Sequence, residues 1–200
     1  MHISEGVLAA PVLIGGGALT VIGTAIGLHR LDYDRIMHTA ILTAAFFVAS
    51  LIHVPIGPGS IHLVLNGLLG ILLGWACFPA ILVALLLQAV FFQFGGLLVL
   101  GVNTFNMAAP ALLCGYLVRP FLARPRGRAL AGFAGGAAAI LLAAVCMALS
   151  LALSDRGFLT TAQLTVAANL PIMLIEGFIT MFTVTFLAKV HPDILSGGRP

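Results

Sequence analysis

The sequence has very few charged residues for a chain of its length. Of its 200 residues, 8% are charged and 61% are hydrophobic, whereas a soluble domain has about 25% charged residues. Such a composition excludes a soluble globular fold, because too few charges are present to cover its surface. It is typical of a membrane protein, where lipid surrounds most of the surface and each spanning helix needs about 20 mainly apolar residues.

Several functional motifs are also absent. The chain has one lysine, Lys189, and no GxxxxGK[ST] loop, so we do not expect it to hydrolyse ATP. It has no HExxH motif, and Ser50 and Ser60 have no evident base, which argues against an intramembrane hydrolase. The net charge of +3 comes from few basic residues and does not indicate a nucleic-acid partner. Three unpaired cysteines are predicted to be small core residues: Cys77, Cys114 and Cys146.

Apolar runs separated by turn residues or charges predict an all-α bundle of about seven transmembrane helices. We expect residues 1–200 to form a single transmembrane domain. The predicted helices cover residues 7–28, 36–54, 61–77, 80–101, 105–118, 129–153 and 162–188. Gly95-Gly96 leave open that the fourth helix stops early and that residues 95–104 form a folded loop. Glycines spaced four apart predict closely packed helices: Gly23 and Gly27, Gly70 and Gly74, Gly132 and Gly136.

The distribution of arginine and lysine predicts the orientation, because cytoplasmic loops carry the excess of these residues. With the N-terminus outside, eight of the nine basic residues lie inside, and only Arg156 lies outside. We therefore expect the N-terminus outside and the C-terminus in the cytoplasm. No ordinary secretory signal is expected at the start, since residues 1–6 carry no basic side chain.

The first two residues indicate metal chemistry. His2 is too bulky for the usual removal of Met1, so we expect a free amine one residue before an imidazole. The Met1 amine, the His2 backbone nitrogen and the nearer His2 ring nitrogen can close fused chelate rings on one metal. A planar set of nitrogens suits Ni(II) or Cu(II), and low-spin Co(II) also adopts it. Because these groups must release protons, binding should weaken as the pH falls.

A planar site needs a fourth ligand, for which His62 is the best candidate. In PIGPGSIH, residues 55–60 are predicted to form a tight outer turn, and His62 is predicted to open the third helix. The alternative that His62 only meets water at the membrane boundary stays open. His53, at the outer end of the second predicted helix, also stays open as an alternative ligand or as a residue beside the ligands. The other histidines are expected at the cytoplasmic surface: His29, His38 and His191.

Three stretches resemble one protein family. MHISEG, GSIHLVLNGLLG and LLLQAVFFQFGGLLVLGVNTFNMA are similar to the substrate-binding component of energy-coupling-factor transporters for cobalt and nickel, the CbiM/NikM family. The resemblance covers most of the chain. It implies a seven-helix bundle into which residues 1–6 insert from outside as a metal-binding segment. The implied metal ligands are Met1, His2 and His62.

The resemblance also points to residues around the ligands. Asn103 and Asn106 in GVNTFNMA would hydrogen-bond the N-terminal segment and orient the ligands, or would satisfy backbone groups at a turn. Glu5 would neutralise the site or steer cations, or would cap the first helix. Gln93-Phe94 stand where the family often has a polar or charged pair, which puts a role of this loop in metal specificity in doubt.

The implied function is capture of Co(II) at the outer face of the bacterial cytoplasmic (inner) membrane, feeding cobalamin synthesis, with Ni(II) as the alternative. The implied partners are a membrane coupling subunit, cytoplasmic ATPase subunits and a small accessory membrane subunit. The chain itself would be no enzyme and would need no cofactor. Its basic stretch RPFLARPRGR would contact these partners or lipid head groups. A self-sufficient secondary carrier or channel remains the rival, although the sequence lacks the internal repeats typical of carriers.

Glu176 lies near the middle of the seventh predicted helix. A carboxylate at that depth must be protonated, paired or turned toward the bundle interior. We expect a structural hydrogen bond within the bundle or to a partner. A role in transport is the alternative.

Overall fold

The structure, a computed structural model, describes residues 2–56, 59–122 and 124–196. The described part contains eight helices and one hairpin. Their bounds are α1 Ala10–His29, α2 Ile36–Ala49, β1 His53–Ile56, β2 Gly59–His62, α3 Asn66–Leu73, α4 Cys77–Phe92, α5 Leu100–Leu122, α6 Arg128–Ser154, α7 Leu159–Val190 and α8 Pro192–Ser196. Short turns of 3-10 helix precede α2, α4 and α7.

Five stretches of the described chain are long and apolar enough to cross a membrane. They are α1, α5, α6, α7 and the continuous stretch Asn66–Phe92, which combines α3 and α4. The prediction of a helical, multi-pass membrane protein is therefore confirmed. By contrast, α2 has 14 residues and α3 has 8. At 1.5 Å per residue, neither helix reaches the roughly 30 Å of a bilayer core by itself.

Several boundaries differ from the sequence prediction. The second helix was expected to reach residue 54 and the third to begin at residue 61, but α2 ends at Ala49 and α3 begins at Asn66. Between them, β1 pairs antiparallel with β2. The helix prediction was therefore wrong for residues 50–54 and 61–65, on either side of the predicted turn of residues 55–60, whose proline and glycine disfavour helix. The fourth helix ends early at Phe92, as the glycine pair allowed, but only residues 93–99 form the following loop. The fifth helix is longer than expected and spans Leu100–Leu122.

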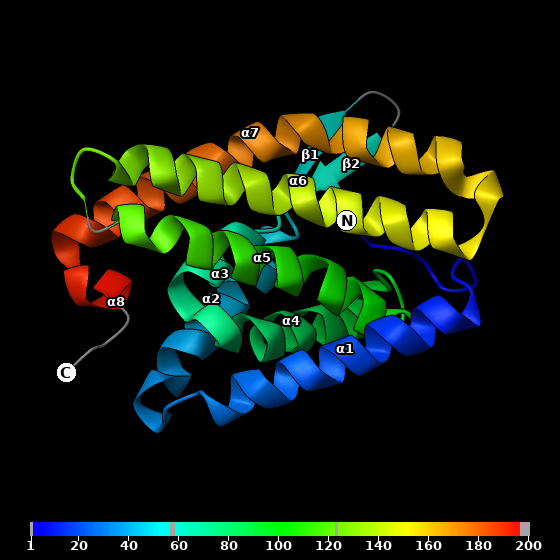
Figure 1. Cartoon of the computed structure of the whole chain (residues 1–200), viewed down its shortest axis with the longest axis horizontal. Coiled ribbons are helices and arrows are strands. Elements are labelled where there is room, and N and C mark those ends of the chain that lie inside the picture. Colours follow the sequence, from blue (N-terminus) through cyan, green and yellow to red (C-terminus); the bar gives the residue numbers. More distant parts are fainter. Residues whose placement is uncertain (1, 57–58, 123, 197–200) are drawn as a thin grey trace.

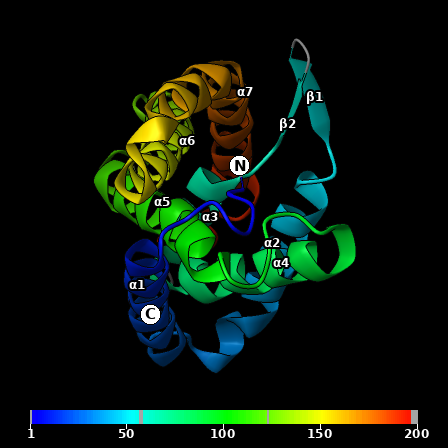
Figure 2. The same ribbon diagram turned by 90° about the vertical axis from the view of Figure 1, so that its right-hand side faces the viewer.

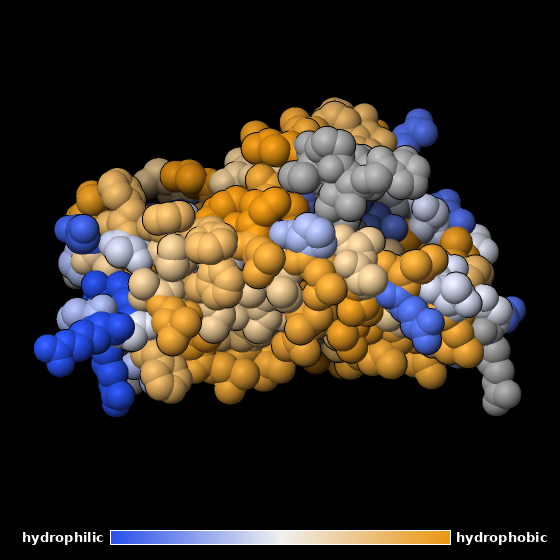
Figure 3. Space-filling model, turned by 90° about the horizontal axis from the view of Figure 1, so that it is seen from above, coloured by the Kyte–Doolittle hydropathy of each residue, from blue (hydrophilic) through white to orange (hydrophobic). Residues whose placement is uncertain are grey.

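The long helices run side by side, and the two ends of the bundle differ. Residues 2–9 run from within the bundle toward one end, where α1 begins, whereas α8 lies at the other end (Figure 1). The turns between α1 and α2 and between α5 and α6 lie at the α8 end. Apolar residues cover most of the side of the molecule, and hydrophilic residues gather mainly toward its ends (Figure 3). The basic residues in or next to the segments at the α8 end are Arg30, Arg35, Arg119, Arg124, Arg126, Arg128 and Lys189.

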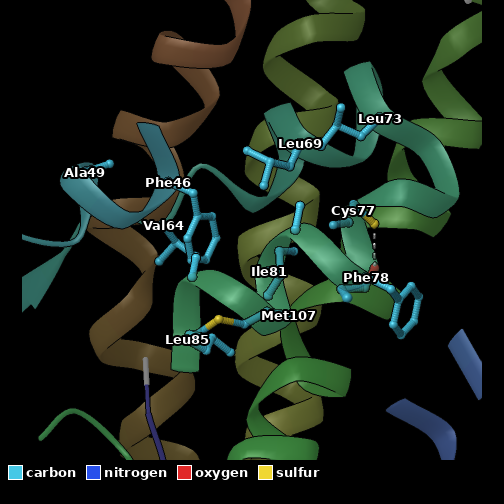
Figure 4. Packing of buried hydrophobic residues seen from close by; sticks show 14 of the residues in the cluster. Phe46, Ala49, Val64, Leu69, Leu73, Cys77, Phe78, Ile81, Leu85 and Met107 are labelled. Atoms are coloured by element: carbon cyan, nitrogen blue, oxygen red, sulfur yellow. Dashed lines mark hydrogen bonds between the residues drawn. The ribbon is translucent and has the colours of Figure 1, made fainter. Parts of the chain in front are cut away.

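The main core lies where α2, α3, α4 and α5 meet. Phe46, Val64, Leu85 and Met107 pack together there, and each is at most 2% exposed (Figure 4). The three cysteines are free, and two of them are buried, in agreement with their predicted packing role.

The spaced glycines allow helices to approach closely, as predicted. A Cβ atom at Gly23 would overlap the Phe78 ring, one at Gly70 would overlap the backbone of Ala111, and one at Gly136 would lie 2.5 Å from the Thr180 hydroxyl. Gly74 instead adopts a φ of +56° where α3 ends, a conformation that favours glycine.

Candidate metal site

The N-terminal segment is fastened to α5 by one asparagine side chain. The Ile3 N–H donates to Asn103 Oδ1 at 3.1 Å, and Asn103 Nδ2 donates to the Ile3 carbonyl at 3.1 Å. Ile3 is 2% exposed. A side-chain amide thus pairs both backbone groups of one residue, as a neighbouring strand would, and fixes the chain directly after His2. The structure brings Asn103 to the N-terminal segment, where the sequence placed it.

The loop of residues 93–99 packs against the same segment. Glu5 Oε1 accepts the Leu98 N–H at 3.0 Å. Gly96 has a φ of +141° and leaves no room for a Cβ beside Glu5, while a Cβ at Gly95 would lie 2.9 Å from Asn103 Nδ2. The loop therefore needs glycine at both positions. The expectation that Glu5 caps the first helix is wrong, because the N-cap of α1 is Ala9 and no side chain caps it.

Three rings meet next to this loop. The His2 and His62 ring centroids lie 5.0 Å apart with an interplanar angle of 21°. Phe94 lies 5.8 Å from His2 and 6.2 Å from His62, also stacked. Viewed along the bundle, the N-terminal segment passes β2, α3 and the loop after α4 (Figure 2). The two predicted imidazoles are thus adjacent, although His62 belongs to β2 and does not open a helix.

Burial prepares the histidine pair for metal binding. Burial of the ring, more than nearby positive charge, lowers the pKa of His2 to about 2. Its imidazole is therefore neutral at physiological pH and keeps a lone pair. His62 is 8% exposed, and its Nδ1 lies 3.0 Å from the Leu63 carbonyl. An N–H at that nitrogen donates to the carbonyl and leaves the lone pair on Nε2.

The described side chains do not complete a metal site by themselves. Within residues 2–56, 59–122 and 124–196, no group of three or more His, Cys, Asp or Glu side chains could hold a metal ion. The further predicted ligand, Met1, lies outside the described residues. A metal binds in the plane of an imidazole ring, and these two planes are stacked. One ring must therefore turn about its side-chain bonds before both can bind the same ion.

Other predicted residues are placed elsewhere. Asn106 Nδ2 donates to Ser150 Oγ at 3.1 Å, so the structure does not bring Asn106 to the N-terminal segment. The backbone of His53 lies opposite His62 in the hairpin, and its side chain is outside the described part of the chain. The three remaining histidines are exposed, as expected: His29, His38 and His191.

Phe94 is a residue of this site that sequence reasoning missed. The departure of Gln93-Phe94 from the family pattern put a role of this loop in metal specificity in doubt, and Phe94 was not expected beside the two imidazoles. The sequence did contain one signal: Phe94 stands directly before Gly95-Gly96. Two glycines allow a loop to pack closely on another segment, and the residue next to them then lies close to that segment too.

A multi-pass helical bundle in which a buried imidazole stacks on the half-buried imidazole of the N-terminal segment defines a candidate metal-binding membrane component. The family described as "Cobalt uptake substrate-specific transmembrane region", CbiM, matches residues 2–194. A Haemophilus influenzae protein provisionally named as a metal transport protein is 43% identical, over 98% of this chain and 97% of that one. The cobalt transport protein CbiM of Sorangium cellulosum is 34% identical, over 98% and 94%.

Solved structures agree with the sequence relatives. A crystal structure of a transition metal transporter matches with a TM-score of 0.82 and 28% identity, covering 98% of this chain and 96% of that one. The chain therefore belongs to the CbiM family. It is a transmembrane component for cobalt or nickel uptake, and its relatives are named as transport proteins, which points to a transporter and not to an enzyme.

Proposed function

We propose that this chain captures Co(II) at the outer face of the cytoplasmic membrane, as the substrate-specific subunit of an ATP-driven energy-coupling-factor transporter. The observation that carries the proposal is the stacked pair of His2 and His62, whose ring centroids lie 5.0 Å apart and which Phe94 also joins. Two imidazoles brought together from distant segments, one neutral because it is buried, suit a divalent transition metal.

The proposed ligands are the Met1 amine, the backbone and ring nitrogens of His2, and the ring of His62. Two features support backbone nitrogens as ligands. Among the described residues, no His, Cys, Asp or Glu side chain joins His2 and His62 in a group of three that could hold a metal, and the amide of Asn103 holds the backbone directly after His2. Residues 1–6 thus act as the metal-binding segment, and His53 remains the alternative to His62.

The proposed topology has seven crossings with the N-terminus outside and the C-terminus in the cytoplasm. Gathering of basic residues at the α8 end supports this orientation. In it, α2 leads away from the α8 end and α3 leads back to it, because Arg35 before α2 donates to the Leu72 carbonyl of α3. Each of the two crossings is completed by non-helical residues, 50–56 after α2 and 59–65 before α3, since neither helix is long enough alone. The histidine pair then faces the side from which a nutrient metal arrives.

The proposed partners are a membrane coupling subunit, cytoplasmic ATPase subunits and a small accessory membrane subunit, in the bacterial inner membrane. The lack of a phosphate-binding loop supports a need for ATPase partners. Imported cobalt would feed cobalamin synthesis. In vesicles loaded with ATP, we expect Co(II) uptake only when the chain is combined with its ATPase module. Equal uptake by the chain alone would favour a secondary carrier.

Nickel is the second candidate substrate. A fused nickel transport protein NikMN of Rhodobacter capsulatus is 36% identical over 72% of this chain and 46% of that one, so named relatives include both metals. The affinity order of N-donor sites places Ni(II) above Co(II) and does not decide between them. Metal analysis of the purified protein, followed by competition between the two ions, tests the choice. Retention of cobalt under equal nickel supports the proposal, and its displacement favours nickel.

A further inference from the structure

Glu176 is a buried acidic residue that supplies no metal ligand. It lies near the middle of α7 and is 1% exposed. Its carboxylate accepts the N–H groups of two consecutive residues. The Leu65 N–H lies 2.9 Å from Oε1 and 3.0 Å from Oε2, and the Val64 N–H also donates to Oε1. The expected structural hydrogen bond within the bundle is therefore present.

These bonds hold the link between the hairpin and α3. The Leu63 N–H donates to the Ile52 carbonyl at 3.2 Å at the end of the hairpin, and α3 begins at Asn66. Glu176 accepts the two N–H groups in between. Since lipid offers no water to satisfy such groups, the carboxylate determines how the chain passes from strand to helix.

The link has an unfavourable backbone conformation that its surroundings must maintain. Leu65 has a φ of +55°, in the left-handed region that leucine rarely adopts. Such a conformation persists where neighbouring contacts determine it. Val64, 1% exposed, is packed beside Phe46 in the core, so the link is held by a side chain as well as by the carboxylate (Figure 4).

His62 is attached directly to this link. It precedes Val64 by two residues, and its Nδ1 lies 3.0 Å from the carbonyl of Leu63. The position of the His62 ring therefore depends on the backbone that Glu176 holds. A shift of the link would move the His62 imidazole relative to His2. In this way α7 influences the metal site, although α7 itself supplies no ligand.

We propose that Glu176 is a positioning residue for the metal site: through residues 63–65 it holds the His62 imidazole where a metal bound at His2 requires it. This inference rests on the proposed role of His62 as a ligand. It gives α7 a part in metal binding, and it predicts that replacing a carboxylate on another helix changes the geometry of the bound metal.

The test compares variants of the full chain, purified in detergent. In Glu176→Gln, one oxygen still accepts, but the amide NH₂ faces the second N–H. We expect Co(II) affinity to fall about 10- to 100-fold, the usual effect of losing a group that orients a ligand, and the visible absorption bands of the Ni(II) complex to shift. Thr180→Val is the matched control, because Thr180 lies one turn further along α7 and is 0% exposed. It should leave both affinity and spectrum unchanged.

Glu176→Asp provides a second variant, since it keeps the carboxylate but withdraws it by one methylene. We expect an intermediate loss of affinity and a smaller spectral shift. Unchanged affinity and spectrum in both variants would overturn the inference. Loss of the fold in both would also overturn it, because the carboxylate would then hold the bundle and not the link. If the His62→Ala variant itself binds Co(II) normally, His62 is not a ligand and that part of the proposed function is wrong. If only the Glu176 variants bind normally, this inference alone fails.

Discussion

Each end of the bundle has a pair of histidines, but the two pairs differ in their surroundings. At one end, the buried His62 stacks with the half-buried His2. At the α8 end, His38 and His191 are exposed and line an open pocket of about 510 Å³ with Asp34 and Arg35. The difference is packing: Asn103 fixes the backbone after His2 and Phe94 stacks on both rings of that pair, whereas His38 and His191 lie exposed. Histidines alone therefore do not identify the metal site.

The largest effect should follow from lengthening the chain at its start. One extra residue before Met1 moves the amine away from the His2 chelate, so both backbone donors lose their geometry. We expect metal affinity to fall by more than the roughly 100-fold that follows from removing a residue that only orients the ligands. Isothermal titration with Co(II) measures it. One extra residue after Pro200 is the control and should have no effect. Equal affinities would show that the amine is no ligand.

The histidine comparison itself can be tested by paired substitutions. His62→Ala removes a proposed ligand and should weaken Co(II) binding by about 100-fold or more. His191→Ala removes an exposed side chain at the other end and should change the affinity less than about twofold. If the two substitutions change the affinity equally, the packing of the His2 and His62 pair does not mark the metal site.

The two asparagines of α5 offer a finer contrast. Asn103→Ala removes both hydrogen bonds to Ile3, so the chelating backbone loses its fixed place and affinity should fall about 10- to 100-fold. Asn106→Ala breaks a buried bond to Ser150 and should lower the thermal stability while leaving metal affinity nearly unchanged. A larger affinity loss for Asn106→Ala would contradict the placement of these two residues.

Acid should loosen the N-terminal segment by a smaller amount. Burial lowers the pKa of His2 to about 2, whereas an unburied histidine has a pKa of about 6.5. The docked segment thus excludes a proton that the released segment binds. Docking is at full strength above pH about 6.5 and weakens below it, by up to about 1.4 kcal/mol per pH unit.

Hydrogen exchange at the Ile3 amide, corrected for its intrinsic pH dependence, measures this docking. Protection should fall between pH about 7 and about 5. His2→Gln, which cannot take up a proton in this range, should show no such fall. A pH dependence that is identical in the two proteins would assign the effect to another group.

Much of the fold could be predicted from local sequence. Long apolar runs without charge have few alternatives to membrane helices, so α1, α6 and α7 begin and end within three residues of their predicted bounds. The hairpin could not be predicted in the same way. Apolar residues around Pro55 and Gly59 are compatible with both helix and strand, and only the pairing of residues 53–56 with 59–62 decides between them.

The candidate site was predictable where residue type alone restricts the chemistry. A histidine next to an amine and a second histidine on the same side lead to the His2 and His62 pair. The roles of Phe94 and Glu176 depend on contacts between segments far apart in the chain, which a single sequence does not contain. Asn103 and Asn106 are alike in sequence, and three positions along a helix place them on nearly the same side, about 4.5 Å apart along the axis. Only the structure shows that one meets Ile3 and the other Ser150.

The central claim is that backbone nitrogens of the chain's first residues and two imidazoles hold the metal. X-ray absorption of the Ni(II)-loaded, full-length protein tests it most directly. The account predicts four nitrogen neighbours in a planar arrangement, with scattering from two imidazole rings. A six-coordinate spectrum with mainly oxygen neighbours, or scattering from one imidazole only, would contradict it.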